Sequence, residues 1–587
     1  MFLSSRWGSC LCVKRRQQKS AGIYQAFMLK VHHTGMKTIV HASNAPALCR
    51  ALAAHALSAL ACLAAPVFCL TAAAQTAPVL VNASATSLPD LGDGTAISTT
   101  AERKLGDSIV RSLYRDPDYL DDPVMTDYVQ SLWQPLLKAA RARGDLRADL
   151  DDSFAWEILL SRERDVNAFA LPGGYFGVYM GLVGLVQTRD ELASVLGHEM
   201  SHVTQRHFAR KTDNDAARTP WMIGGMILGL IAASRSQSSC NALNQCTNSG
   251  YDAANALIMG SQALAIQGAL NYSRDMEREA DRTGFGVASE AGFAPQGFVS
   301  MFEKLQQSSR NNDSGGFPYL RSHPLNTDRI ADMQTRIGVE QANNKPLETD
   351  WQALLMAARA RLLSDSSVDG LQRWQADVLP PVLATKAPAQ QAAALYGGAL
   401  AALKLRAYEQ AGALATQLAG VAGAPPVVDR LVRLLRTDIA LAQDQGGLAL
   451  ATMTTPVRTA DTKEMSLERA ELLLRAQVQV RSGDAARAAT ALYVWVVNHP
   501  RDLGAWRALG EAYEAQGRPV AAIRAHAQAD GLQYDWTAAL GRLRAAQDLV
   551  RKGQWGAHGP DHIEASIVDT RAREIVQLLR EQANQQR

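Results

Sequence analysis

The chain has 587 residues, of which 47% are hydrophobic and 20% are charged, and this composition is that of a folded globular protein. Its formal net charge is +3, and the basic residues are interspersed with acidic ones, which excludes a surface built to bind nucleic acid. Alanine is abundant while aromatic residues make up 6%, so helices are favoured over sheets. At roughly 100 to 200 residues per domain, this length predicts two or three folded units.

The N-terminal segment has the layout of a secretory signal. Past Met36 and a lysine, residues 50–75 read RALAAHALSALACLAAPVFCLTAAAQ, an apolar stretch that ends in small residues. Ala72 and Ala74 supply a cleavage signature, and five of the seven cysteines lie in this segment, as expected for an exported protein. We therefore expect residues 1–75 to be an N-terminal extension and signal peptide. Translation from Met36 and an uncleaved membrane anchor stay open as alternatives.

Helical patterns begin near Ala101 and give way to a strand-like region over residues 154–186. A turn is predicted over residues 171–174, which read LPGG, with one or two short strands around it and residues 178–183 leading into a helix. Such a strand can serve as the edge to which an extended peptide adds its backbone hydrogen bonds. A plain hairpin of the core is the alternative.

The next segment predicts a helix from about Asp190 to Arg210. Thr188 and Glu191 stand in the S/T-x-x-E arrangement that caps helix N-termini, and an apolar stripe follows them. Within this helix, residues 195–207 read VLGHEMSHVTQRH, so two histidines lie four positions apart with a glutamate directly after the first.

Histidines four positions apart on a helix point the same way, because each residue turns about 100°. His198 and His202 can therefore share one metal ion, and Glu199 can reach a water molecule bound to that ion. A catalytic zinc site normally takes three protein ligands, so a third ligand must lie elsewhere. His207 is half a turn out of phase with His198 while the helix continues, and we expect it to face away from the ion.

The third ligand is predicted on a second helix. The glycine and histidine that a metzincin would place at 205 and 208 are missing, because the chain has Gln205 and Phe208. Glu277 and Asp281 lie four positions apart, so the first can bind the ion while the second accepts the remaining N–H of a ligand histidine. A solvated charged face is the alternative for this stretch.

Three further predictions concern the region around these motifs. Residues 221–233 are apolar but shorter than the ~17 residues that a membrane crossing needs, so we expect a buried helix or one that faces the membrane. Cys240 and Cys246 lie in a Ser- and Asn-rich loop, where they either form a small disulfide or stay free. The second helix should run from about Ala254 to Thr283 and end at Gly284.

Beyond a polar linker at residues 341–350, nearly every segment reads as helix. Residues 506–513, WRALGEAY, match the tetratricopeptide spacing. A step of 34 residues back from Trp506 reaches Leu472, and Ala488 and Pro500 fall at the matching positions of that unit. Stacked pairs of helices make a concave surface suited to peptides or partner proteins. An ordinary helical bundle is the alternative.

Taken in order, the motifs HEMSH, SRDMEREAD and SHPLNTDR resemble those of the M48 zinc metallopeptidases. The resemblance implies that His198, His202 and Glu277 are the zinc ligands and that Glu199 is the general base. It also implies that Asp281 is a partner of a ligand histidine or a proton donor.

Two residues of the third motif receive roles from the same resemblance. His323 precedes Pro324 and is expected in a loop. The resemblance implies that His323 can take the fourth position on zinc and hold the enzyme latent, whereas capping of the following helix is the alternative. Arg329 either contacts the substrate or its developing oxyanion, or forms a surface salt bridge.

We therefore expect a mainly α protein. Residues 76–340 should form a zincin-like (gluzincin) metallopeptidase domain with a small β-hairpin or sheet, and residues 351–587 an α-solenoid of tetratricopeptide repeats. A secreted peptidase followed by such repeats is similar to the periplasmic β-barrel assembly-enhancing protease group.

That resemblance implies a periplasmic endopeptidase with one Zn²⁺ per chain that degrades misfolded or stalled outer-membrane proteins and assists β-barrel assembly. The repeats would bind the outer-membrane β-barrel assembly machinery, and a peripheral contact with the membrane stays open. No nucleic-acid partner is expected. The alternative is a chaperone or scaffold of that machinery whose proteolysis is latent.

Overall fold

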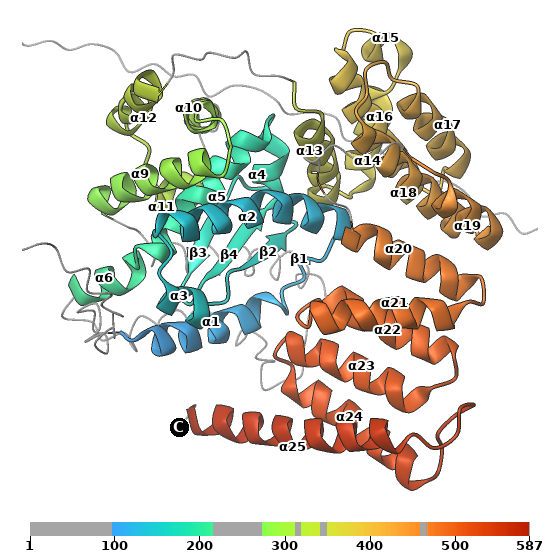
Figure 1. The fold of residues 1–587 in the computed structure, drawn as a ribbon. Helices are drawn as coiled ribbons and strands as arrows, with labels where there is room; N and C mark the ends of the chain where they lie inside the picture. The colour runs from blue at the N-terminus through green and yellow to red at the C-terminus, as the bar shows by residue number, and fades with distance from the viewer. Residues whose placement is uncertain are drawn as a thin grey trace, which may run out of the picture. The chain divides into compact units, whose positions relative to one another are not determined.

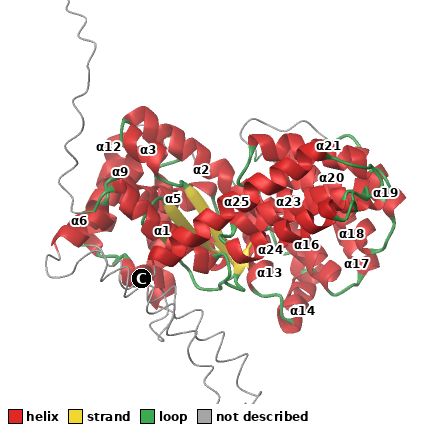
Figure 2. Ribbon diagram, turned by 90° about the horizontal axis from the view of Figure 1, so that it is seen from below, coloured by secondary structure: helices red, strands yellow, loops and turns green. Residues whose placement is uncertain are grey.

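The computed structural model describes residues 97–214, 273–310, 318–340, 349–457, 465 and 468–585. These residues are mainly helical and include one small sheet, as Figures 1 and 2 show, so the predicted fold class is confirmed. The N-terminal extension, the apolar segment 221–233 and the two cysteines Cys240 and Cys246 lie outside the described residues.

The first part of the chain carries ten described helices around the sheet. They are α1 (Thr99–Leu113), α2 (Pro123–Arg143), α3 (Ala148–Ser153), α4 (Met180–Leu185), α5 (Arg189–Thr204), α6 (His207–Asn214), α9 (Arg274–Glu290), α10 (Gln296–Arg310), α11 (Pro318–Ser322) and α12 (Thr327–Glu340). Local signals explain several of their ends. Asp122 caps α2 by accepting from the backbone N–H of Met125, and Gly144 ends the helix in the left-handed conformation that favours glycine.

Four strands form the sheet in the order β1-β2-β4-β3. They are β1 (Tyr119–Leu120), β2 (Glu157–Ser161), β3 (Ala168–Leu171) and β4 (Tyr175–Tyr179). β2 and β4 run parallel, whereas β3 and β4 form the predicted hairpin, whose turn holds Gly173 and Gly174 at φ +78°. β3 therefore lies at one edge of the described sheet, and it packs against α5.

The predicted helix over 190–210 was too long. α5 ends at Thr204, Arg206 adopts a φ of +51°, and α6 then starts afresh. The cause lies outside the helix: the guanidinium of Arg206 is buried and donates to the Ile97 carbonyl oxygen at 2.8 Å and to the Glu102 carboxylate of α1 at 3.0 Å. This anchor holds the chain in a left-handed turn that a non-glycine residue rarely adopts.

The predicted end of the second helix at Gly284 was also wrong. α9 continues through Gly284 to Glu290, and the residues predicted before Ser273 lie outside the described part of the chain. Gly284 is needed for packing, since a Cβ atom placed there would lie 2.9 Å from the backbone of Gly197 on α5. The glycine thus marks a close crossing of two helices and does not end one.

Beyond residue 350 the structure describes only helices. They are α13 (Trp351–Ser364), α14 (Val368–Asp377), α15 (Pro380–Leu383), α16 (Pro388–Lys404), α17 (Tyr408–Ala419), α18 (Pro426–Ala442), α19 (Gly446–Thr454), α20 (Glu468–Arg481), α21 (Ala485–Asn498), α22 (Leu503–Ala515), α23 (Pro519–Leu532), α24 (Trp536–Arg551) and α25 (His562–Gln585). From α20 to α25 each helix packs against the next, in orange to red in Figure 1. The predicted repeat residues Leu509 and Ala488 share one small core there.

The largest core spans both parts of the chain. It joins the interior of the sheet and its helices, for example Trp133 and Met200, to Leu355 of α13 and onward to Val478 of α20. α13 packs directly on α4, within the compact unit Ser87–Arg587. Among the described residues, no helix is both long and apolar enough to cross a membrane.

Candidate metal centre

The candidate centre lies where α5 and α9 cross. α5 begins with a complete capping box, in which the Thr188 side chain accepts from the Glu191 backbone N–H and the Glu191 side chain accepts from the backbone in return. The close approach of Gly197 to Gly284 then brings the two helix backbones together. As a result, the histidines of α5 face the carboxylates of α9 in the protein interior.

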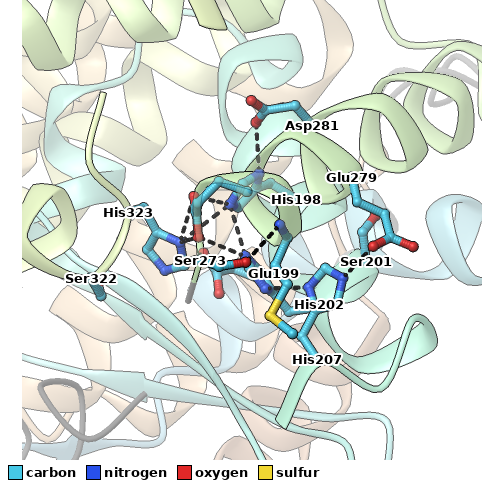
Figure 3. A network of polar contacts seen from close by, with 12 residues as sticks. His198, Glu199, Ser201, His202, His207, Ser273, Glu279, Asp281, Ser322 and His323 are labelled. Atoms are coloured by element: carbon cyan, nitrogen blue, oxygen red, sulfur yellow. Dashed lines mark hydrogen bonds and ion pairs between the residues drawn. The ribbon is translucent and has the colours of Figure 1, made fainter. Parts of the chain in front are cut away.

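Four buried side chains offer donor atoms within 4.8 Å of one another: His198, His202, Glu277 and His323. Figure 3 shows the labelled histidines among them pointing toward one another from α5 and from the segment after α11. The Nε2 atoms of His198 and His202 lie 3.0 Å apart, and each lies 3.5 Å from a Glu277 oxygen. Nδ1 of His323 lies 3.3 Å from His198 Nε2 and 3.0 Å from Glu277 Oε1.

These separations fit a small tetrahedral ion. Ligand atoms about 2.0 to 2.1 Å from a tetrahedral zinc ion stand roughly 3.3 Å apart. The donor-to-donor distances given above scatter around that value, although each side chain comes from its own position in the fold. Imidazole nitrogens with one carboxylate are also a donor set that suits zinc among the divalent metals. The residues present therefore fit a metal site.

Glu199 is buried next to this cluster and has no hydrogen-bond partner among the described residues. Neither of its carboxylate oxygens accepts a hydrogen bond from the described residues, and Nε2 of His323 is 3.4 Å from its Oε1 atom. Buried carboxylates are normally hydrogen-bonded, because an unpaired buried polar group costs free energy. An orphaned carboxylate beside four converging donors is the arrangement expected of a group that works on a bound water molecule or substrate.

Asp281 and Arg329 support the cluster from behind. The Nδ1 atom of His198 lies 2.9 Å from Asp281 Oδ1, and Arg329 donates to both Asp281 oxygens at 2.6 and 2.7 Å. Arg329 also reaches Glu277 Oε2 at 3.0 Å. Its side chain is only 3% exposed, so the surface location considered for this ion pair was wrong. The guanidinium fixes two carboxylates that face the histidines.

The charges of the centre are strongly coupled. Burial opposes protonation of His198, but hydrogen bonds to Asp281 and Glu277 outweigh it and raise the pKa of His198 to about 9. Burial, joined by the neighbouring imidazoles, holds the pKa of His202 well below its usual value. Burial also opposes ionisation of Glu277, yet His323 and His198 lower the pKa of Glu277 well below the usual range. The carboxylates of this cluster therefore attract positive charge, which a metal ion can supply.

His323 follows α11 directly and is buried. Its ring packs against that of Tyr319, with centroids 4.8 Å apart, and its backbone N–H donates to the Tyr319 carbonyl oxygen at 2.9 Å. The start of α12 is instead capped by Asn326, which accepts from the backbone N–H of Arg329 at 2.9 Å. The alternative in which His323 caps that helix is therefore wrong.

His207 is not among the four converging donors, as the helical phase predicted, but it contacts one of them, which the phase did not predict. Because α5 stops at Thr204 and the chain turns at Arg206, the His207 ring packs against His202, and its Nδ1 atom lies 2.9 Å from Nδ1 of His202, the ring nitrogen that does not face the other donors (Figure 3). Nothing in the local spacing indicates this break. The break depends on a long-range contact, because the buried Glu102 of α1 draws Arg206 out of the helix.

An HExxH helix whose histidines meet a glutamate from a second helix, beside a small mixed sheet, defines a metallopeptidase. The model of Peptidase family M48 matches residues 127–337. The chain is 31% identical over 500 residues to the Putative beta-barrel assembly-enhancing protease of Vibrio cholerae, covering 84% of this chain and 92% of the relative.

Two further relatives agree with this assignment. The Beta-barrel assembly-enhancing protease of Escherichia coli is 29% identical, with 82% of this chain and 90% of the relative covered. The Mitochondrial metalloendopeptidase OMA1 of Saccharomyces cerevisiae is 25% identical, with 40% of this chain and 64% of the relative covered. The chain belongs to peptidase family M48 and is a metalloendopeptidase.

Proposed function

We propose that this protein is a periplasmic zinc endopeptidase that cleaves misfolded or stalled outer-membrane proteins and assists the assembly of β-barrels. The observation that carries the proposal is the convergence of four buried donor atoms within 4.8 Å beside a buried glutamate that has no hydrogen-bond partner in the described part of the chain. The names of the two bacterial relatives, which align over nine-tenths of their own length, support the role in β-barrel assembly.

In this proposal His198, His202 and Glu277 hold the zinc ion. When bound, the ion polarises the scissile carbonyl group and lowers the pKa of a water molecule. Asp281 Oδ1 lies 2.9 Å from Nδ1 of His198 and is placed to accept the proton on that nitrogen, which would keep the lone pair of Nε2 directed at the ion. Arg329 holds Asp281 and Glu277 in these orientations, so its support of the carboxylates accounts for its burial better than a direct substrate contact does.

Glu199 is the proposed general base. Its carboxylate can accept a proton from a water molecule and return that proton to the leaving amine, and burial beside the donor cluster keeps bulk water from competing. The edge strand β3, which packs against the helix carrying Glu199, offers a place for an extended peptide to align by backbone hydrogen bonds.

His323 is proposed to keep the enzyme latent. With Nδ1 among the donors and Nε2 at 3.4 Å from Glu199, its ring occupies the space that a water molecule and a substrate carbonyl need. Withdrawal of the ring would open the site. We propose that a partner bound at the C-terminal helices triggers this withdrawal.

The remaining assignments follow the same proposal. Residues 1–75 act as extension and signal peptide, residues 76–340 carry proteolysis, and residues 351–587 act as tetratricopeptide repeats that bind the β-barrel assembly machinery, joined by a linker at 341–350. The stacked helices α20 to α25 support the repeat assignment. A chaperone or scaffold with latent proteolysis is the second candidate function. The position of His323 among the donors favours a resting state in which proteolysis is latent.

Substitution Glu199→Gln tests the enzymatic role. We expect the purified mature protein to retain one zinc ion per chain while cleavage of casein falls by about 10²- to 10⁴-fold, because the variant keeps the shape of the side chain but cannot accept the proton. Glu303→Gln, at an exposed position of α10, is the matched control and should cleave as the unmodified protein does. Cleavage by Glu199→Gln at the unmodified rate would refute this function.

A further inference from the structure

The two histidines of the HExxH motif have different partners at Nδ1, the ring nitrogen that does not face the other donors. Nδ1 of His198 lies 2.9 Å from a carboxylate oxygen of Asp281. Nδ1 of His202 lies 2.9 Å from another imidazole nitrogen, Nδ1 of His207. The other ring nitrogen of His207, Nε2, lies 3.2 Å from a carboxylate oxygen of Glu279 (Figure 3). A histidine is thus inserted between a proposed ligand and a carboxylate.

The positions of the protons between His202, His207 and Glu279 follow from the chemistry of imidazole. A ring nitrogen that binds a metal must present its lone pair, so Nε2 of His202 carries no proton and Nδ1 does. Two nitrogens 2.9 Å apart share one proton, and therefore Nδ1 of His207 must accept it. The neutral His207 ring then carries its own proton on Nε2, where Glu279 can accept it. Each N–H group in this series of hydrogen bonds, from His202 through His207 to Glu279, therefore has an acceptor.

Contacts from three neighbouring residues hold His207 in the position in which it can accept the His202 proton. The buried Arg206 side chain ties the turn before α6 to Glu102 of α1 at 3.0 Å. Arg210, one turn further along α6, donates to the same Glu279 oxygen at 2.9 Å. Glu279 itself lies on α9, two positions after the proposed ligand Glu277. The His207 ring is fully buried, so its orientation is fixed by packing as well.

We propose that His207 is a positioning residue for the metal centre: it accepts the Nδ1 proton of His202 and passes the hydrogen bond on to Glu279, which fixes His202 in its metal-binding tautomer. This inference rests on the proposed ligand set. It assigns to His207 and Glu279 together the role that Asp281 has for His198. Partners of this kind typically change metal affinity by about 10- to 100-fold when they are removed.

The experiment compares metal affinity across substitutions at 207. His207→Phe keeps a ring but has no acceptor for the His202 proton, whereas the Oδ1 atom of His207→Asn stands near the position of the lost Nδ1 atom. We expect zinc affinity, measured by chelator competition on the full chain, to fall about 10- to 100-fold for His207→Phe. His207→Asn should lie between that variant and the unmodified protein. Glu279→Gln, which retains an acceptor oxygen but loses the charge, should weaken binding least.

Cobalt substitution supplies a second readout that general destabilisation does not mimic. With Co²⁺ in place of zinc, the visible absorption band of His207→Phe should shift or weaken, because the His202 ring is free to rotate, while His207→Asn should keep a band near that of the unmodified protein. His558→Phe, at an exposed histidine far along the chain, is the matched control and should change neither quantity.

The outcomes separate this inference from the proposed function. If the unmodified protein binds no zinc, the proposed metal centre itself fails. If the unmodified protein binds zinc and folded His207→Phe binds it equally tightly with an unchanged cobalt spectrum, the positioning role is refuted and the metal centre stands. Should His207→Phe fail to fold, the comparison of His207→Asn and Glu279→Gln with the unmodified protein decides the matter by the same criteria.

Discussion

At the scale of single residues, His323 makes close polar contacts with three groups that the proposed reaction needs. Its Nδ1 atom contacts His198 and Glu277, and its Nε2 atom faces Glu199. The ring follows α11, a helix of five residues, and is stacked against Tyr319 of that helix. A movement of this short segment can withdraw the ring while α5 and α9 keep their positions.

Substitution His323→Ala should therefore raise proteolysis in the absence of any partner. If the latent arrangement holds about 90 to 99% of the molecules, removing the ring increases casein cleavage by roughly 10- to 100-fold, because the fraction of open sites limits the observed rate. His558→Ala serves as the control for loss of an exposed histidine. An unchanged or lower turnover of His323→Ala, with zinc still bound, would contradict latency.

Residue spacing predicts only what a single helix determines. His198 and His202 could be paired from the sequence because four positions of one helix suffice, and the same spacing linked Glu277 to Asp281. The direction of His207 could not be predicted, because it depends on an ion pair between Arg206 and a glutamate 104 positions earlier. The burial of Arg329 likewise depends on how α12 packs, which the local pattern does not encode.

At the scale of elements, the decisive feature is the crossing of α5 and α9. A Cβ atom at Gly284 would lie 2.9 Å from the carbonyl carbon and oxygen of Gly197 and from the backbone nitrogen of His198. A Cβ atom at Gly197 would lie 3.2 Å from the Gly284 carbonyl oxygen, a milder conflict. Because these neighbours are backbone atoms, a side chain at position 284 must push the two helices apart.

Substitution Gly284→Ala should lower both stability and metal affinity. We expect the free energy of unfolding to fall by about 1 to 3 kcal/mol, as for other overpacked interiors, and zinc affinity to fall with it because Glu277 moves away from the two histidines. Gly197→Ala should show a smaller loss. Denaturant titration with and without zinc measures both quantities.

Gly338→Ala provides the matched control for the helix crossing. Gly338 lies inside α12, and a Cβ atom there would meet nothing within 4 Å. Alanine should therefore stabilise this helix by up to about 1 kcal/mol through its higher helix propensity. If Gly284→Ala behaved like Gly338→Ala, the close crossing would not be what positions Glu277.

The elements themselves were largely predictable from local signals. The Thr188 and Glu191 capping box gave the start of α5 within a residue, and the paired glycines gave the β3–β4 turn. The ends of α5 and α9 were mispredicted for the same physical reason. In each case a contact with another helix is responsible: Glu102 of α1 binds the guanidinium of Arg206 outside α5, and Gly284 lies within α9 at the close crossing with α5.

At the scale of the whole molecule, partly buried ion pairs join the two parts of the chain. Arg359 of α13 donates to both oxygens of Asp122, the residue that caps α2, at 2.7 and 2.8 Å. Arg469 of α20 pairs with Asp121 at 2.8 Å. The composition and helical spacing of residues 351–587 predict the helices, but they do not predict that α13 and α20 share the core of the first part. That arrangement depends on contacts between residues more than 200 positions apart.

Asp438 of α18 makes the stability of this junction depend on pH. Burial raises the pKa of Asp438 to about 6, because Arg359 only partly offsets it and Asp122 adds to it. Burial also acts on Asp122, but Arg359 outweighs it and holds the pKa of Asp122 below its usual value. The pKa values of two carboxyl groups beside one guanidinium are thus shifted in opposite directions.

The sign of the Asp438 contribution follows from proton counting. Between about pH 4, where an unfolded aspartate titrates, and pH 6, the folded protein keeps a proton that the unfolded chain has lost. The free energy of unfolding therefore falls as pH rises through this window, by at most about 1.4 kcal/mol per pH unit, and the loss is complete above pH 6.

Substitution Asp438→Asn should remove this dependence, because the amide resembles the protonated acid and does not ionise. We expect the variant and the unmodified protein to unfold at the same urea concentration at pH 4, whereas the variant should be more stable at pH 7.5. Taking the difference between the two proteins at each pH cancels the titration of the histidines near the metal centre, which they share. A difference that stayed constant from pH 4 to 7.5 would show that Asp438 is ionised throughout and that burial at this junction is weaker than the structure indicates.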